Sequence, residues 1–212
     1  MANANLADGR PQTAPKVKEW LFDPFTYIAG GKSLLIGAAA ILLAGLVGSL
    51  GNTHFDGVLD IHTGRPEALW VFLAEGIIDW LFLAIILFIT GKIVSKRAFR
   101  AIDLLGTQAM ARWPTLFSAA ASLLPPYQRF LTNLPGLLQG SGGFQVHFAE
   151  AAVAAVVMLI TLAAMVWMVA LMYRSYSICC NVKGARGAVS FIFGLLAAEV
   201  LSKVVLVKVL LS

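Results

Sequence analysis

The chain has 212 residues, of which 59% are hydrophobic and only 13% are charged, with a mean hydropathy of +0.82. Soluble domains carry about a quarter charged residues, so this composition excludes an ordinary soluble protein and predicts an integral membrane protein of one domain. The net charge of +5 does not indicate a nucleic-acid surface, because the basic residues are dispersed among short loops.

The N-terminal region divides into a polar tail and a lead into the first span. Residues 1–15 are polar and contain two prolines, so we expect a disordered tail and not a cleavable signal peptide. Residues 16–31 mix lysines with aromatics such as Trp20 and Tyr27, a combination suited to the lipid headgroup layer. We interpret them as a short interfacial helix that breaks near Asp23-Pro24, with the wet end of the first span as the alternative.

Five segments are long and apolar enough to cross about 30 Å of hydrocarbon as helices. We therefore expect an all-α fold, a polytopic bundle of five transmembrane helices within residues 16–212. The expected spans are residues 33–51, 69–90, 101–124, 148–172 and 187–210. Pro125-Pro126 ends the third span, and residues 127–147 are expected to form a loop along the membrane interface.

Basic residues are concentrated on one side of this topology. Eleven of the 16 lysines and arginines fall before the first span or near the turns that follow the second and fourth spans. These are Arg10, Lys16, Lys18, Lys32, Lys92, Lys96, Arg97, Arg100, Arg174, Lys183 and Arg186. The two opposite loops hold one each, Arg65 and Arg129. Because an excess of Lys and Arg in short loops marks the cytoplasmic side, we expect the N-terminus inside and the C-terminus outside.

Ionisable residues inside the predicted spans are costly and normally face a partner or a cavity. Glu75 and Asp79 share one face of the second span, Arg112 lies in the third, and Glu199 and Lys203 lie in the fifth. At about 1.5 Å per residue, Asp79 and Arg112 both fall near the membrane midplane. We expect Asp79 to pair with Arg112, with Glu199 as second choice, and Glu75 to pair with Lys203.

The third span also contains polar residues and a helix breaker. These are Asp103, Gly106, Gln108 and Pro114. Asp103 lies near the inner turn, within reach of Arg97, Arg100 or water. Pro114 follows Arg112 by two residues, so we expect the helix to open there and to free backbone carbonyls near the ion pair.

Two interpretations of the interior charges stay open. Matched opposite charges favour a structural role, in which the pairs lock the second, third and fifth spans together. Intramembrane carboxylates also occur in proton relays and transporters, and an opened helix at Pro114 favours that alternative. A small ion- or proton-coupled transporter would use Glu75, Asp79, Arg112 and Glu199.

Neither catalysis nor a cofactor is indicated. The histidines fall in the predicted outer loops, and the sequence contains no Gly-x-Ser-x-Gly and no His-Glu-x-x-His. His54, Asp56, Asp60 and His62 are residue types that bind divalent metals, but their spacing matches no compact motif, so we favour a solvated polar loop. The adjacent pair Cys179-Cys180 excludes a disulfide framework and suits a helix end. We expect a non-enzymatic protein without metal or cofactor.

Two stretches resemble the Yip1-domain family of membrane proteins. Leu21-Phe22-Asp23-Pro24-Phe25 resembles the (N/D)-P-(F/R) motif before the first span of prokaryotic members. Phe99 to Pro114 resembles the family's third span, although Thr107 stands where a Tyr is expected and the Asp-Leu-Tyr-Gly-Pro motif of eukaryotic members is absent. Five spans with the N-terminus inside are also the family's layout. The resemblance implies a protein of a prokaryotic cytoplasmic (inner) membrane that organises lipids, other membrane proteins or copies of itself.

Overall fold

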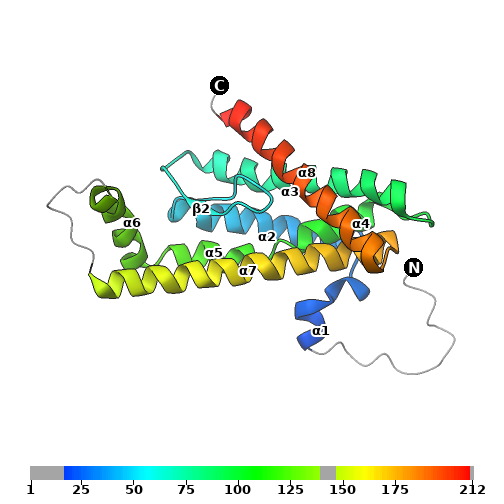
Figure 1. The fold of residues 1–212 in the computed structure, drawn as a ribbon, viewed down its shortest axis with the longest axis horizontal. Helices are drawn as coiled ribbons and strands as arrows, with labels where there is room; N and C mark the ends of the chain where they lie inside the picture. The colour runs from blue at the N-terminus through cyan, green and yellow to red at the C-terminus, as the bar shows by residue number, and fades with distance from the viewer. Residues whose placement is uncertain (1–16, 139–146, 211–212) are drawn as a thin grey trace.

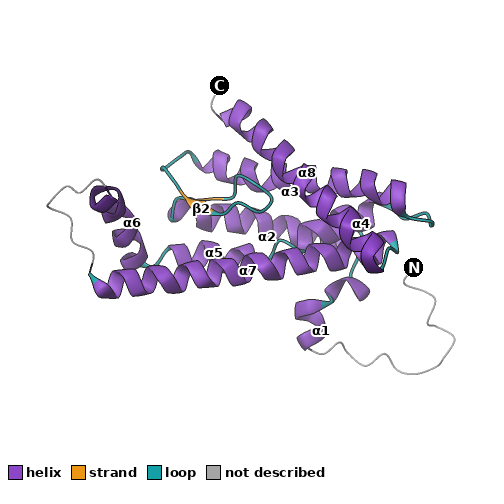
Figure 2. Ribbon diagram, in the orientation of Figure 1, coloured by secondary structure: helices purple, strands orange, loops and turns teal. Residues whose placement is uncertain are grey.

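The computed structural model describes residues 17–138 and 147–210, and these residues are mostly helical (Figures 1 and 2). The predicted tail, residues 1–15, lies outside the described residues. The elements in chain order are α1 (Val17–Phe22), the 3₁₀ turn η1 (Pro24–Thr26), α2 (Gly31–Leu50), β1 (Thr53–His54), β2 (His62–Thr63), α3 (Leu69–Val94), α4 (Ala101–Met110), α5 (Thr115–Ser122), α6 (Pro125–Leu138), α7 (Phe148–Cys180) and α8 (Gly184–Leu210). The predicted all-α class is confirmed, with the short antiparallel pair β1–β2 as a local addition.

Four helices, α2, α3, α7 and α8, are long and apolar enough to cross a membrane. Their most apolar windows are between 22% and 39% buried inside the protein, which leaves broad apolar faces for contact with lipid. The predicted bounds of these four spans lie within four residues of the observed helix ends, except at the end of α7. That helix continues to Cys180, where Asn181 in the left-handed conformation (φ 51°) ends it. Arg174 therefore lies on a helix, and its predicted place in a turn is wrong.

The predicted third span is two helices, α4 and α5, separated by a short turn. Pro114 has no N–H and cannot continue the α-helical hydrogen-bond ladder. In its place the Arg112 N–H donates to the Ala109 carbonyl at 3.2 Å and the Trp113 N–H donates to the Met110 carbonyl at 3.2 Å, which is 3₁₀ geometry. The expected opening near Pro114 is thus present, but neither half is long enough to count among the four membrane-spanning helices.

The prediction of a loop over residues 127–147 is wrong for its first part, because α6 runs to Leu138. Residues 139–146 lie outside the described part of the chain. Pro125 and Pro126 occupy the first turn of α6, where the missing N–H groups would have had no helical partner. Tyr127 then packs against α7 in a small apolar cluster with Ala154 and Val157.

The bundle is arranged lengthwise, with α2, α3, α5 and α7 along the long axis and α8 crossing α3 at an angle (Figure 1). Glycine allows the closest approach between α2 and α4. A Cβ atom at Gly37 would lie 2.2 Å from the Met110 nitrogen, so only glycine fits there. The main apolar core lies between α3, α4, α7 and α8 and includes Leu83, Leu104 and Tyr176, which are all fully buried.

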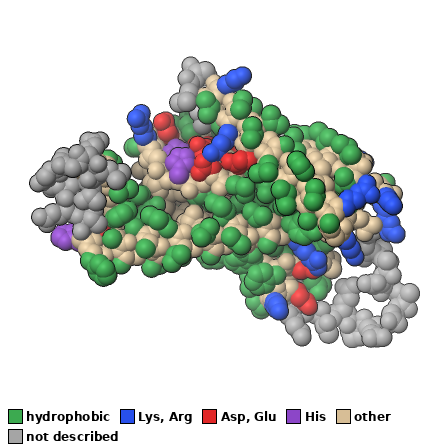
Figure 3. Space-filling view, in the orientation of Figure 1, with side chains coloured by type: hydrophobic (Ala, Val, Ile, Leu, Met, Phe, Trp, Pro, Cys, Tyr) green, Lys and Arg blue, Asp and Glu red, His purple; other side chains and the backbone are tan. Residues whose placement is uncertain are grey.

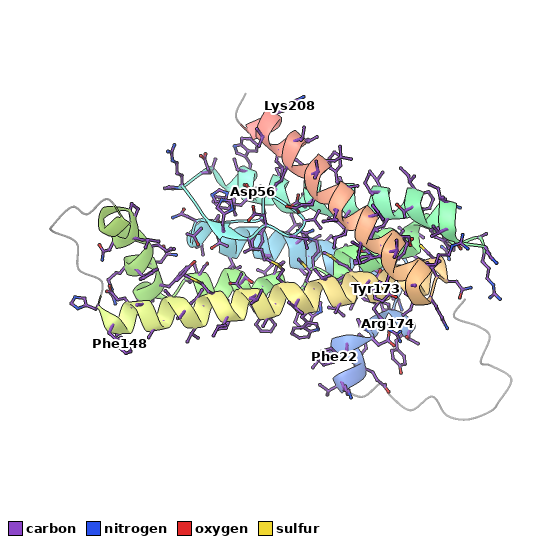
Figure 4. The ribbon with its side chains drawn as sticks, viewed as in Figure 1. Phe22, Asp56, Phe148, Tyr173, Arg174 and Lys208 are labelled. Atoms are coloured by element: carbon purple, nitrogen blue, oxygen red, sulfur yellow. The ribbon has the colours of Figure 1, made fainter. Side chains whose placement is uncertain are left out.

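The N-terminal lead breaks where the sequence predicts. Helix α1 ends at Phe22, Asp23 leaves the helical conformation (φ −147°, ψ 48°), and η1 starts at Pro24. Arg174 on α7 donates to Asp23 Oδ2 at 2.6 Å, and the Trp167 indole donates to the Leu21 carbonyl at 3.0 Å. Figure 4 shows α1, with Phe22, beside the end of α7 that carries Tyr173 and Arg174. These contacts fix α1 against the bundle as a separate short helix.

Candidate functional site

The loop between α2 and α3, residues 51–68, folds back onto the bundle. We call it the α2–α3 loop. The predicted solvated loop is wrong for its first half, because His54, Phe55 and Val58 are 7%, 3% and 1% exposed. Phe55 and Val58 bury apolar side chains, and the β1–β2 pairing sets the register of the loop by placing His54 opposite His62. Figure 4 shows Asp56 in this loop, toward the end of the bundle away from Arg174.

The α2–α3 loop supplies both hydrogen-bond partners of Glu75. This carboxylate is on α3 and is 1% exposed. His54 Nδ1 lies 2.8 Å from Glu75 Oε1, and the Phe55 N–H donates to Glu75 Oε2 at 3.1 Å. Both oxygens are therefore satisfied, which is what a buried carboxylate requires. The prediction that Glu75 pairs with Lys203 is therefore wrong.

The surroundings of His54 determine where its protons lie. Nε2 faces the Arg65 carbonyl at 2.9 Å, and a carbonyl only accepts, so Nε2 carries a proton. A further proton must then lie between Nδ1 and the Glu75 carboxylate, which leaves the pair with no net charge in either arrangement. The hydrogen bond to Glu75 is the largest cause that raises the pKa of His54, and it outweighs burial, which lowers it. The pair is thus a buried group that holds one shared proton.

A second carboxylate, Glu199 on α8, is also bound by the α2–α3 loop. The Leu59 N–H donates to Glu199 Oε2 at 2.8 Å, and Lys203 Nζ lies 3.7 Å from Glu199 Oε1. A Cβ atom at Gly57 would lie 2.7 Å from the same Oε1 atom, so the loop backbone lies directly against the end of the Glu199 side chain. Glu199 therefore holds the loop against α8, and it makes no described ion pair with Arg112.

Lys203 reaches past Glu199 to the loop, where it forms an ion pair with Asp60. Burial raises the pKa of Asp60, but the hydrogen bond and positive charge of Lys203, with His62 nearby, bring that pKa below its ordinary value. The Lys203 side chain is 41% exposed, so this pair is at the surface of the bundle and weaker than the buried ones.

The predicted pair between Asp79 and Arg112 is present at the centre of the bundle. Arg112 Nη2 lies 3.7 Å from Asp79 Oδ2, and the two side chains are 3% and 0% exposed. Neither carboxylate oxygen of Asp79, nor Arg112 Nη1, has a hydrogen-bond partner among the described residues. The charges are matched, but the polar atoms are not satisfied by protein groups.

A separate polar network joins α4 and α7 about one helical turn before Arg112 in the chain. Gln108 donates to the Met172 carbonyl and to Ser175 Oγ, both at 3.0 Å. Ser175 in turn donates to Thr107 Oγ1 at 2.7 Å, and Thr107 donates to the Asp103 carbonyl at 2.7 Å. Among these residues, sequence reasoning identified Gln108 but missed Ser175, because a serine carries no charge and the neighbouring Arg174 pairs with Asp23 on the lead segment instead.

The remaining residues singled out in the predicted third span, Asp103, Gly106 and Pro114, have contacts that suit a structural role. Asp103 Oδ2 lies 4.0 Å from Arg100 Nε, as expected from its place near the turn. Gly106 faces α2 so closely that a Cβ atom would lie 2.4 Å from the Gly30 carbonyl oxygen. Gly106 thus permits the contact between α2 and α4, and Pro114 separates α4 from α5.

Three of the four residues considered for a metal lie together. Asp56, Asp60 and His62 place one ligand atom each within 4.8 Å of one another, whereas His54 points to Glu75. His62 Nδ1 lies 3.3 Å from Asp56 Oδ1 and 3.6 Å from Asp60 Oδ1. Lys203 also pairs with Asp60, so a protein cation already lies beside these carboxylates.

The charged interior therefore links α3 to α8 through the α2–α3 loop, and it links α3 to the turn between α4 and α5 through the Asp79–Arg112 pair. Its chemistry includes a shared proton at His54–Glu75, a fixed carboxylate at Glu199 and an incompletely satisfied pair at Asp79–Arg112. No protein-family model matches this chain, and neither does any curated protein or solved structure.

Proposed function

We propose that this chain is a non-enzymatic integral membrane protein that organises lipid or protein partners, and that its interior charges hold its helices together. The observation that carries the proposal is that one buried loop gives backbone donors to both Glu75 and Glu199. An ion-carrying carboxylate must exchange its partners in each cycle. Backbone N–H groups of Phe55 and Leu59 can leave only if the loop itself unfolds, so these two carboxylates suit a structural role.

The proposal includes a fifth crossing made of α4 and α5 together. The turn between them keeps right-handed helical angles at Ala111 and Pro114, so the chain continues in one direction. Residues 101–122 would extend about 33 Å at about 1.5 Å per residue, against about 30 Å of hydrocarbon. With five crossings, the basic turns at residues 95–100 and 181–183 fall on one side, which we assign to the cytoplasm. The Yip1-like resemblance and a prokaryotic inner membrane belong to the same proposal.

The orientation is tested with single cysteines in a background of Cys179→Ala and Cys180→Ala. Glu67, just before the start of α3, and Ala185, at the start of α8, are both exposed. In the proposed topology Glu67 lies on the outer side of the membrane and Ala185 on the cytoplasmic side. A membrane-impermeant maleimide added to intact cells should label Glu67→Cys and not Ala185→Cys, whereas both should react after the cells are lysed. The reverse pattern would show that the assignment of sides is wrong.

A transporter is the second candidate function, and one observation favours it. Asp79 and Arg112 are buried with unsatisfied polar atoms, beside the interruption between α4 and α5. Broken helices with ionisable residues near the midplane are a common feature of ion and substrate sites in secondary transporters. In this alternative, Asp79 would accept and release a proton or cation opposite Arg112.

Flux through purified protein in liposomes separates the two functions. Under an imposed proton or sodium gradient, the organising role predicts no flux above that of empty liposomes, and it predicts that Asp79→Asn mainly lowers thermal stability. A transporter would show flux that Asp79→Asn abolishes while the fold survives. Glu67→Gln, at an exposed position of the α2–α3 loop, is the control and should change neither property.

A further inference from the structure

A basic pocket of about 270 Å³ lies at the end of the bundle where α3, α7 and α8 meet. Four of its seven lining residues are cationic and none is acidic. The cations are Lys96, Arg97, Lys183 and Arg186. Figure 3 shows Lys and Arg side chains gathered at this end of the molecule, at the right of the view, whereas carboxylates and a histidine lie together over the middle.

Two turns form the pocket, and hydrogen bonds hold each of them in shape. After α3, the Ser95 hydroxyl donates to the Arg97 carbonyl at 2.8 Å and accepts from the Arg97 N–H at 3.1 Å. After α7, the Val182 N–H donates to the Ser177 carbonyl at 3.1 Å, and Ser177 Oγ donates to the Val182 carbonyl at 2.7 Å. Because α3 also packs against α8, both turns are attached to helices that contact each other, and this brings the four cations together.

The cations of this pocket lack the carboxylate partners that several other cations of the protein have. Arg129, Arg174 and Lys203 each form an ion pair with a carboxylate. Among the described residues, none of the four pocket cations forms an ion pair, and all four are exposed. A membrane-orientation signal requires basic residues in short loops, but it does not require them to converge on one cavity, where they repel one another. The convergence indicates an anionic ligand.

The first turn of α8 adds to the attraction for an anion. This helix begins at Gly184, between the two pocket cations Lys183 and Arg186. The free N–H groups of a helix start carry positive partial charge, and together with the cations they suit a phosphate group. Apolar surface adjoins the charges: Val94 and Val182 line the pocket, and Ile93 nearby is 75% exposed.

We propose that this pocket binds the phosphate of an anionic phospholipid headgroup, with the acyl chains lying against the exposed apolar faces of α3 and α8. The pocket lies at the ends of three helices long and apolar enough to cross a membrane, which is where headgroup phosphates lie. A lipid also explains why apolar surface continues from the charged cavity, whereas a free phosphate would not use it. This inference names a lipid partner for the organising role and rests on that proposed function.

The test measures binding of phosphatidylglycerol to the full-length protein in detergent, by native mass spectrometry and by titration, with phosphatidylcholine as the zwitterionic reference. Removing two pocket charges in Lys183→Gln/Arg186→Gln should weaken phosphatidylglycerol binding about 25-fold, at about fivefold for each cation. The swap Lys183→Arg/Arg186→Lys keeps the charges and should keep most of the affinity. The matched control Lys32→Gln/Arg100→Gln removes two charges from exposed positions near the same end but outside the pocket, and it should have little effect.

Three results would overturn the proposal. Equal losses in the pocket and control variants would show general surface attraction, and equal binding of the two lipids would show that the headgroup charge is not recognised. Displacement of the lipid by inorganic phosphate at millimolar concentration would show a site for a free anion. These outcomes can be told apart from those of the liposome experiment. If the protein shows neither flux nor a lipid site, the organising role stands and its partner is a protein. If the protein shows flux and a lipid site, the lipid site stands and the organising role is wrong.

Discussion

Glu75 and Asp79 lie one helical turn apart on the same face of α3, yet their surroundings differ completely. Both are buried, at 1% and 0% exposure. Glu75 has a hydrogen-bond partner for each oxygen, whereas neither oxygen of Asp79 has one among the described residues, and its nearest charge is Arg112 at 3.7 Å. The two carboxylates thus have the same secondary structure, nearly the same burial and opposite degrees of satisfaction.

The difference comes from what lies opposite each residue. Glu75 faces the α2–α3 loop, where irregular backbone leaves N–H groups such as that of Phe55 free to donate. Asp79 faces α8 and Arg112 in the turn between α4 and α5, where the backbone N–H groups already donate within the helix or the turn, so only side chains can serve it. A buried acid in a helical bundle is therefore well satisfied near a loop and depends on one counter-charge between the helices.

The largest expected effect is at the buried pair Asp79–Arg112. Arg112→Leu and Asp79→Leu each strand a buried charge, so each should lower the stability of the detergent-solubilised protein by about 3–5 kcal/mol. The double variant removes both charges and should recover much of that loss. Thermal unfolding of all four proteins gives the coupling directly. Additive losses would mean that the two side chains do not stabilise each other, and the same cycle would then be run with Glu199.

A smaller effect is expected at Glu75. Glu75→Gln keeps the side-chain shape but removes the charge that strengthens two hydrogen bonds to the loop, so a loss of about 1.5–3 kcal/mol is expected. Loosening of the loop should appear as faster hydrogen exchange at Phe55. Glu67→Gln, at an exposed position of the same loop, is the control and should leave both measurements unchanged. If Glu75→Gln changed neither the stability nor the hydrogen exchange at Phe55, the view that this carboxylate holds the loop would be wrong.

The smallest effect is the pH dependence that His54 brings. The pKa of His54 is raised in the folded protein, with the hydrogen bond to Glu75 as the main cause. Its stabilisation is therefore fully present below the unfolded pKa of about 6.5 and is lost as the pH rises through the higher folded value. Melting temperature should fall across that interval, and His54→Gln should flatten the profile. His147→Gln, exposed before α7, should retain it. A wild-type profile that is flat or rises there would mean that His54 stays neutral.

Much of the bundle follows from local sequence. Composition and apolar runs locate the starts of α3 and α7 to the residue, at Leu69 and Phe148, and depth counting pairs Asp79 with Arg112. These inferences succeed because helix rise is uniform, so that position along an apolar helix translates into depth. The break at Pro114 also follows from one residue, since proline cannot donate wherever it stands.

The partners of Glu75 and Lys203 were decided only by the tertiary structure. Depth counting considers side chains on helices, and it paired these two residues because both lie nearer the outer ends of their spans. It could not include the Phe55 and Leu59 N–H groups, because every residue has such a group and nothing in the sequence marks which ones a folded loop leaves free. Which donors reach a buried carboxylate depends on how the loop packs against α3 and α8, and that packing is set by contacts between segments far apart in the chain.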